Sequence, residues 1–131
     1  MTARISHVSI DCVDAHALSE WWKQVLGFVD VDGDPDVPGD EECTIVSPST
    51  GERLLFLEVP GFDTGIPKRV HLDLRPVERS RDEELEVLLG LGATQVADHR
   101  GTHGPGTGWV VLADPEGNQF CILRGGHELT A

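Results

Sequence analysis

The chain begins with alternating apolar and polar residues, the pattern of a half-buried strand. The segment 4–13 is rich in Ile and Val, and its alternation puts His7, Ser9 and Asp11 on one face. The opposite face then carries Val8, Ile10 and Cys12. We therefore expect one polar and one apolar face in this first strand.

Apolar residues with helical spacing follow this strand. They lie at i, i+3, i+4, i+7 and i+8 and are Leu18, Trp21, Trp22, Val25 and Leu26. Asp14 is suited to cap the helix at its start, and Gly27 is suited to end it. The spacing predicts that both tryptophans belong to the core and not to a ligand site.

The rest of the first half is expected to be a short strand at 28–31, a loop at 32–42, and strands at 43–47 and 53–59. The loop is dense in Asp, Gly and Pro. Part of it, with Asp30, Asp32, Asp34 and Glu41, has calcium-loop spacing, but Pro35 occupies the position of the turn glycine. We therefore interpret it as a solvated acidic loop.

The same order of elements returns after a crossover at 60–68. A strand at 69–74 precedes a helix that begins with a capping box of Ser80 and Glu83 and has an apolar stripe. Three further strands are predicted at 93–97, 108–113 and 118–123. The chain is thus expected to be one α+β domain over 1–131, with repeat halves at approximately 4–60 and 69–125.

An internal comparison supports this repeat. His7 and His71 lie at matching points of the first strand of each half. Two alignments of the last strands are compatible with that match, and they pair either Leu57 or Leu55 with Cys121. Both alignments keep the same strand face, so the sequence leaves the choice open.

Composition narrows the class of protein. The net charge of −13 is unfavourable for binding nucleic acid or an anionic membrane surface. Three widely spaced cysteines fit neither a disulfide framework nor a metal motif of the CxxC type. No apolar run is long enough to cross a bilayer and no signal core opens the chain, so a cytoplasmic location is expected.

Four segments in order resemble one known family. They are His7-Val-Ser-Ile-Asp-Cys-Val-Asp14, Trp21-Trp-Lys-Gln-Val-Leu-Gly-Phe28, Arg69-Val-His-Leu-Asp-Leu74 and Asp114-Pro-Glu-Gly-Asn-Gln-Phe-Cys121. Together they resemble the glyoxalase/bleomycin-resistance, or vicinal-oxygen-chelate, superfamily, and within it the glyoxalase-like branch. The resemblance implies two βαβββ modules that form a U-shaped, partly closed mixed sheet around a central pocket. It also implies a homodimer.

The resemblance further implies a metal site built from the first and last strands of each half. His7 and His71 match two ligand positions of the family, whereas the two glutamate positions hold Leu57 and Cys121. The neighbouring Glu58 points to the other sheet face. Glyoxalase I or ring-cleaving dioxygenase chemistry, which needs such a carboxylate, is therefore not expected.

Two interpretations of the remaining residues stay open. His7, His71 and Cys121 with one open position would suit zinc, or both histidines are hydrogen-bonded pocket residues beside a buried thiol. Asp73 and Asp11, on the same faces as the histidines, could orient the imidazoles. The expected pocket lining is His7, Ser9, Leu55, Leu57, Val59, His71, Asp73, Trp109 and Cys121.

The glycine-rich loop 99–108 is either a flexible lid whose His103 reaches a ligand or an ordinary connector. The leading hypothesis is a protein that binds a small organic molecule in the pocket between its modules, with no catalytic residue assigned. The alternative is an atypical divalent-metal enzyme of lyase, isomerase or dioxygenase type. A partner-binding module is less supported, because burial explains the helix stripes.

Overall fold

The computed structural model describes residues 2–66 and 68–129. The chain divides into two compact units, one that ends at Thr64 and one that begins at Gly65. This boundary falls inside the segment 60–68, which separates the two repeat halves. Neither described helix has the length and apolar composition that a bilayer crossing requires.

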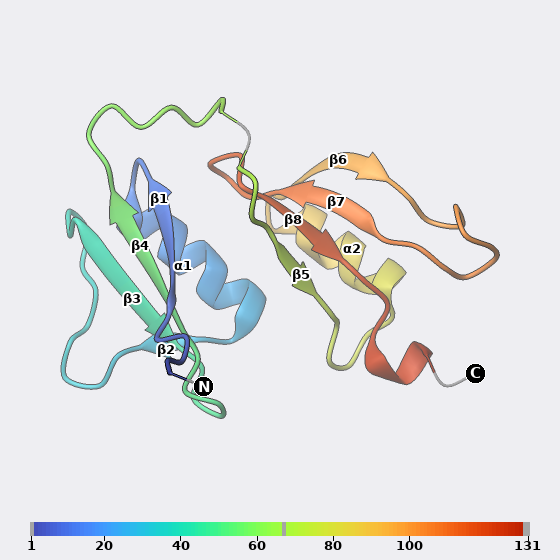
Figure 1. Cartoon of the computed structure of the whole chain (residues 1–131), viewed down its shortest axis with the longest axis horizontal. Coiled ribbons are helices and arrows are strands. Elements are labelled where there is room, and N and C mark those ends of the chain that lie inside the picture. The colour runs from blue at the N-terminus through green and yellow to red at the C-terminus, as the bar shows by residue number, and fades with distance from the viewer. Residues whose placement is uncertain (1, 67, 130–131) are drawn as a thin grey trace. The chain divides into compact units, whose positions relative to one another are not determined.

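The first unit contains one helix and a four-stranded mixed sheet (Figure 1). Its elements are β1 (Val8–Cys12), α1 (Ala15–Leu26), β2 (Val29–Asp30), β3 (Glu42–Val46) and β4 (Arg53–Glu58). The strand order is β1-β4-β3-β2, in which β1 runs parallel to β4 and the other pairs are antiparallel.

The second unit repeats this arrangement. Its elements are β5 (Leu72–Leu74), α2 (Arg81–Gly90), β6 (Thr94–Asp98), β7 (Val110–Ala113), β8 (Gln119–Ile122) and the short 3₁₀ helix η1 (Gly126–Glu128). The order β5-β8-β7-β6 matches that of the first unit, with β5 parallel to β8. The α+β class and the doubled module are confirmed, with one four-stranded mixed sheet in each unit.

Local signals in the sequence fix the helix ends. The Asp14 side chain accepts a hydrogen bond from the Ala17 amide at 3.0 Å, which satisfies a free donor of the first turn. Gly27 ends α1 in the left-handed region with φ of 69°. Ser80 and Glu83 exchange the two hydrogen bonds of the predicted capping box at the start of α2.

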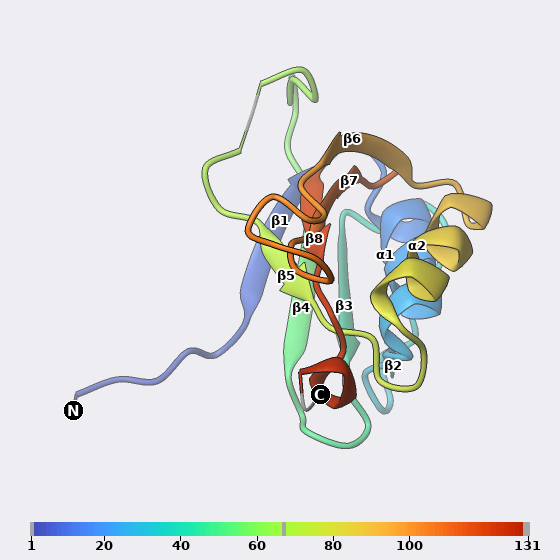
Figure 2. The same ribbon diagram turned by 90° about the vertical axis from the view of Figure 1, so that its right-hand side faces the viewer.

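Each helix covers one face of its own sheet (Figure 2). In the first unit Trp22 of α1 is buried in a core that also holds Ile45 and Phe56. Trp21 is 7% exposed, so the prediction that both tryptophans are core residues is confirmed. The buried residues of the second unit's core include Leu85, Leu88, Val110, Leu112, Phe120 and Ile122. Within each unit, no helix among the described residues covers the other face of the sheet.

The first strand of each half is shorter than its alternating segment. The segment 4–13 gives a strand at Val8–Cys12, and the segment 69–74 gives one at Leu72–Leu74. Both are edge strands with a single partner, so a ladder forms only where β4 or β8 lies alongside. Alternation predicted which face each residue occupies but not where pairing begins.

Candidate functional site

Strand register decides which residues share the open face of each sheet. In the first unit Ser9 lies opposite Leu55 and Asp11 opposite Leu57. In the second unit Asp73 and Val111 both lie opposite Cys121. Since side chains alternate along a strand, these residues point away from the face that the helix covers.

The register also tests the two alignments of the repeat. A residue of β1 pairs with one 46 positions later, as Ser9 does with Leu55, whereas Asp73 of β5 pairs with Cys121, 48 positions later. The matches of His7 with His71 and of Leu57 with Cys121 therefore cannot both hold. If the histidines are equivalent, Leu55 is the counterpart of Cys121.

The turns before the last strands agree with the Leu55 alignment. Gly51 and Gly117, which this alignment matches, have similar φ values of 78° and 84°. Gly51 donates to the carbonyl of Ser47 at 3.0 Å, and Gly117 donates to that of Asp114 at 2.9 Å. The two glycines therefore match when the last strands are shifted by two residues, although the Gly51 bond spans four residues and the Gly117 bond spans three.

His71, Asp73 and Cys121 form a compact group on the open face of the second unit. One potential metal-ligand atom from each lies within 4.8 Å of the others. The His71 Nε2 is 3.2 Å from an Asp73 carboxylate oxygen. Cys121 is buried, whereas the other two side chains are about half exposed, so an ion or molecule has access to them. Asp73 thus contributes a carboxylate beside the thiol.

Burial, followed by the neighbouring Asp73 charge, raises the pKa of the Cys121 thiol to about 11. The thiol is therefore protonated near neutral pH, and it hydrogen-bonds Asp73. A bound divalent cation would favour the thiolate form of Cys121, because its positive charge stabilises the deprotonated sulfur that coordinates it. The group can act as a metal ligand, but the isolated thiol is a poor nucleophile.

The three residues of this group line a cavity of about 410 Å³. Its apolar wall is formed by Trp109, Val111 and Leu123, and its polar side by His71, Asp73 and Gln119, with Cys121 also lining it. Such a mixture of an apolar wall and a few polar groups is typical of sites for small organic molecules.

Two histidines of the loop 99–108 flank Trp109. The ring centroids of His99 and Trp109 are 5.0 Å apart, and those of His103 and Trp109 are 6.1 Å apart in a stacked arrangement. His99 and Trp109 are also joined by a backbone hydrogen bond of 2.9 Å. Gly108 has φ of 93°, and a Cβ there would collide with the His99 carbonyl. His103 thus contacts Trp109 but is not among the residues that line the cavity.

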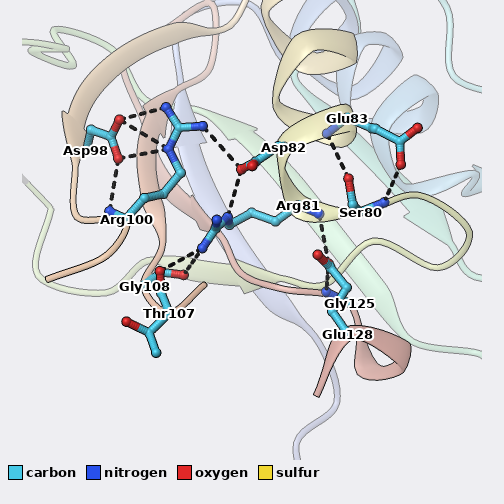
Figure 3. Close-up of polar contacts among 10 residues, drawn as sticks. All are labelled: Ser80, Arg81, Asp82, Glu83, Asp98, Arg100, Thr107, Gly108, Gly125 and Glu128. Carbon is cyan, nitrogen blue, oxygen red and sulfur yellow. Dashed lines mark hydrogen bonds and ion pairs between the residues drawn. The ribbon is translucent and has the colours of Figure 1, made fainter. Parts of the chain in front are cut away.

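Figure 3 shows how the start of α2 holds this loop. The Arg81 side chain is 7% exposed and donates to the carbonyls of Thr107 and Gly108 at 2.8 and 2.9 Å. Arg100 adds ion pairs with Asp98 and Asp82. These contacts favour a loop fixed to the unit rather than a free lid. No local pattern in the sequence points to Arg81, because its partners lie 26 and 27 residues away along the chain.

In the first unit His7 lines a different cavity, of about 520 Å³, together with Leu55. The Ser6 hydroxyl is 3.0 Å from His7 Nδ1. Ser9 is exposed on β1, and Leu57 is half-buried on β4 outside the residues that line this cavity. His7 belongs to neither group of three ligand atoms found among residues 2–66 and 68–129.

A second such group consists of Asp36 and Asp40 of the acidic loop and Cys43 of β3. Asp32, Asp34 and Glu41 are exposed, as expected of a solvated loop. Asp36 differs, because one of its carboxylate oxygens is buried without a hydrogen-bond partner. Burial and the nearby Asp30 charge raise the pKa of Asp36 to about 6.

The comparisons with known proteins identify the family. Residues 7–123 match the model of the glyoxalase-like domain. The chain therefore belongs to the glyoxalase-like domain family, and the resemblance found in the sequence is confirmed. No curated protein matches the chain.

Solved structures show the same fold at low sequence identity. A mutant of the fosfomycin resistance protein FosX from Listeria monocytogenes, complexed with Mn(II) and 1S,2S-dihydroxypropylphosphonic acid, has a TM-score of 0.68 and 15% identity. That match covers 98% of this chain and 94% of the FosX chain. A glyoxalase/bleomycin resistance protein/dioxygenase family enzyme from Burkholderia phytofirmans has a TM-score of 0.67 and 22% identity, with 92% and 97% covered.

Proposed function

We propose that this protein binds a small organic molecule on the open face of its second sheet, in the cavity beside Trp109 and Cys121. That cavity is the observation that carries the proposal. Its volume of about 410 Å³ lies within the range of roughly 300–1,000 Å³ that is usual for such sites. The FosX structure with a small phosphonic acid is a precedent from the same fold.

The residues have distinct roles in this proposal. Trp109 offers a flat apolar surface that is already ordered by the His99 and His103 rings, so little side-chain entropy is lost on binding. His71 and Asp73 supply a donor and an acceptor at the polar side. Such a lining favours an amphipathic molecule with an apolar body and polar oxygens.

A thermal-shift screen with amphipathic small molecules tests this function. A ligand should raise the melting temperature, and Trp109→Leu should weaken its binding about tenfold through loss of the aromatic contact. Val77→Ala, at a residue 90% exposed in the same unit, is the matched control and should bind normally. If no compound raises the melting temperature, the proposal is wrong.

A divalent-metal enzyme is the second candidate, favoured by the group of His71, Asp73 and Cys121. Imidazole, carboxylate and thiolate are all accepted by zinc, and three protein ligands with one open position are typical of catalytic sites. A bound metal would polarise a substrate oxygen as a Lewis acid. Asp73 would then be a ligand, in place of the orienting role expected from the sequence.

Metal content after equilibration with zinc, measured by elemental analysis, separates the two candidates. His71→Ala and Asp73→Asn should each lower zinc affinity by more than about tenfold, while the exposed His127→Ala should not. Cobalt substitution gives a second measurement, because a thiolate-to-cobalt absorption band appears only if Cys121 coordinates. Protein that takes up no zinc, nickel, iron, manganese or cobalt excludes this candidate.

We also propose a homodimer and a cytoplasmic location, as the family resemblance and the sequence indicate. Sedimentation at several protein concentrations tests the first. A single species with the mass of one chain, 14.2 kDa, at all concentrations would contradict it.

A further inference from the structure

The cavity around His7 lies at the end of the open face in the first unit. It has a volume of about 520 Å³ and receives side chains from the segment before β1, from β3 and from β4. Its polar residues are Arg4, Ser6, His7, Glu42, Thr44 and Arg53. Unlike the cavity beside Trp109, it has little apolar surface, so its occupant must be polar.

Charge makes this cavity unusual in the molecule. The chain has 23 acidic and 10 basic residues, and ion pairs engage Lys23, Arg79, Arg81 and Arg100. The side chains of Arg4 and Arg53 have neither an ion pair nor a hydrogen bond among the described residues. Two unpaired guanidinium groups thus line one cavity with a single carboxylate, Glu42.

The hydrogen-bond donors of the cavity are complementary to an oxoanion. A guanidinium group presents several N–H donors in a planar fork that matches carboxylate and phosphate oxygens. When the Ser6 hydroxyl donates to His7 Nδ1, the proton of the neutral imidazole lies on Nε2, which is then a further donor. Thr44 adds a hydroxyl from β3.

We propose that this cavity binds a small oxoanion that carries a carboxylate or phosphate group, with Arg4 and Arg53 as the principal contacts. The site lies within the first unit and goes beyond the proposed function, because it takes a ligand of its own. A nucleic acid backbone does not fit, because the remaining surface of a chain with net charge −13 repels it.

Titration of the full chain with inorganic phosphate and, separately, with acetate tests the proposal by NMR. Amide signals of Thr44, Arg53 and Leu55 should shift and saturate with one or both anions, and sodium chloride of equal ionic strength should not reproduce this. The anion that binds with the higher affinity shows whether the site prefers a phosphate or a carboxylate group. Shifts that follow ionic strength alone would overturn the proposal.

Substitutions of single arginines test which residues bind the anion. Arg53→Gln should weaken anion binding by about tenfold, which corresponds to about 1.4 kcal/mol. Arg4→Gln should do the same, and because Arg4 precedes β1 and is exposed, its loss cannot act by unfolding the core. Arg69→Gln, at an exposed arginine of the second unit, is the matched control. Equal weakening by all three variants would refute a specific site.

The anion site and the proposed function can fail separately. If a screened ligand binds at Trp109 but neither phosphate nor acetate shifts the signals of Thr44, Arg53 and Leu55, the function stands and the anion site is wrong. If phosphate or acetate saturates the cavity but no organic molecule binds, the anion site stands and the proposed function is wrong.

Discussion

The carboxyl group of Asp36 has a pKa of about 6, because it is partly buried and lies near the negative charge of Asp30. Its ordinary value of 3.8 applies to the unfolded chain, so the folded protein holds the proton more strongly. The group's contribution to stability is then fully present below about pH 4, and it is lost as the pH rises through about 6. Asp36 opposes folding at neutral pH.

Replacing Asp36 should therefore have a pH-dependent effect. Asp36→Asn should raise the urea midpoint at about pH 7.5, where the native carboxyl is charged, and the gain should shrink at about pH 5. Asp32→Asn, at an exposed residue of the same loop, is the control and should show no such pH dependence. A gain that is equal at both pH values would contradict the assignment.

Cys121 provides a second test at the scale of one residue. With a pKa of about 11, about one thiol in a thousand is ionised at pH 8. Alkylation of Cys121 by iodoacetamide in the native protein should therefore be far slower than in urea-unfolded protein, as followed by mass spectrometry of the digested chain. Equal rates would show that the thiol is exposed and ionised in the native state.

Among the elements, α2 has a role beyond its core stripe. Arg81→Gln removes the buried guanidinium and leaves the carbonyls of Thr107 and Gly108 without these donors. We expect a loss of about 2–4 kcal/mol in the free energy of unfolding and a change in Trp109 fluorescence as the loop moves.

The neighbouring Arg79 is the matched control for this variant. Its ion pair with Glu84 is about half exposed on the arginine side, and such pairs contribute at most about 1 kcal/mol. Denaturant unfolding of Arg79→Gln should therefore remain close to that of the original chain. If Arg81→Gln is equally mild, the loop does not depend on α2.

The end of α1 depends on backbone geometry. Gly27→Ala places a Cβ on a residue with φ of 69°, so it should cost about 1 kcal/mol although the space around it is open. Gly90→Ala at the end of α2 has the same open space and no positive φ, so it should be neutral or stabilising. Thermal unfolding of the two variants separates backbone strain from steric contact. Equal effects would rule out strain as the cause.

At the scale of the whole molecule, the net charge of −13 implies self-repulsion that salt should screen. The melting temperature should rise between about 20 mM and 500 mM sodium chloride, a range over which the screening length falls from roughly 20 Å to about 4 Å. A melting temperature that falls with salt would show that local ion pairs, such as those of Arg100, outweigh the repulsion.

The amino-acid sequence by itself determined the elements, their repetition and the family. Helix caps at Asp14 and Ser80 and the alternation around His7 depend on neighbours within a few residues, so they can be read from the chain directly. The burial of both tryptophans followed from the same helical spacing. The structure agrees with the sequence in these features because local hydrogen bonds and one-sided burial specify them.

The tertiary structure alone decided which distant residues meet. A shift of two residues leaves every side chain on the same strand face, so alternation could not choose between Leu55 and Leu57 as the counterpart of Cys121. The registers of β1 on β4 and of β5 on β8 show that the match of Leu57 with Cys121 is incompatible with the match of His7 with His71. The pairing of β5 with β8 likewise brings Asp73 beside Cys121, 48 positions later. Such contacts depend on how separate elements pair, and no local pattern encodes that pairing.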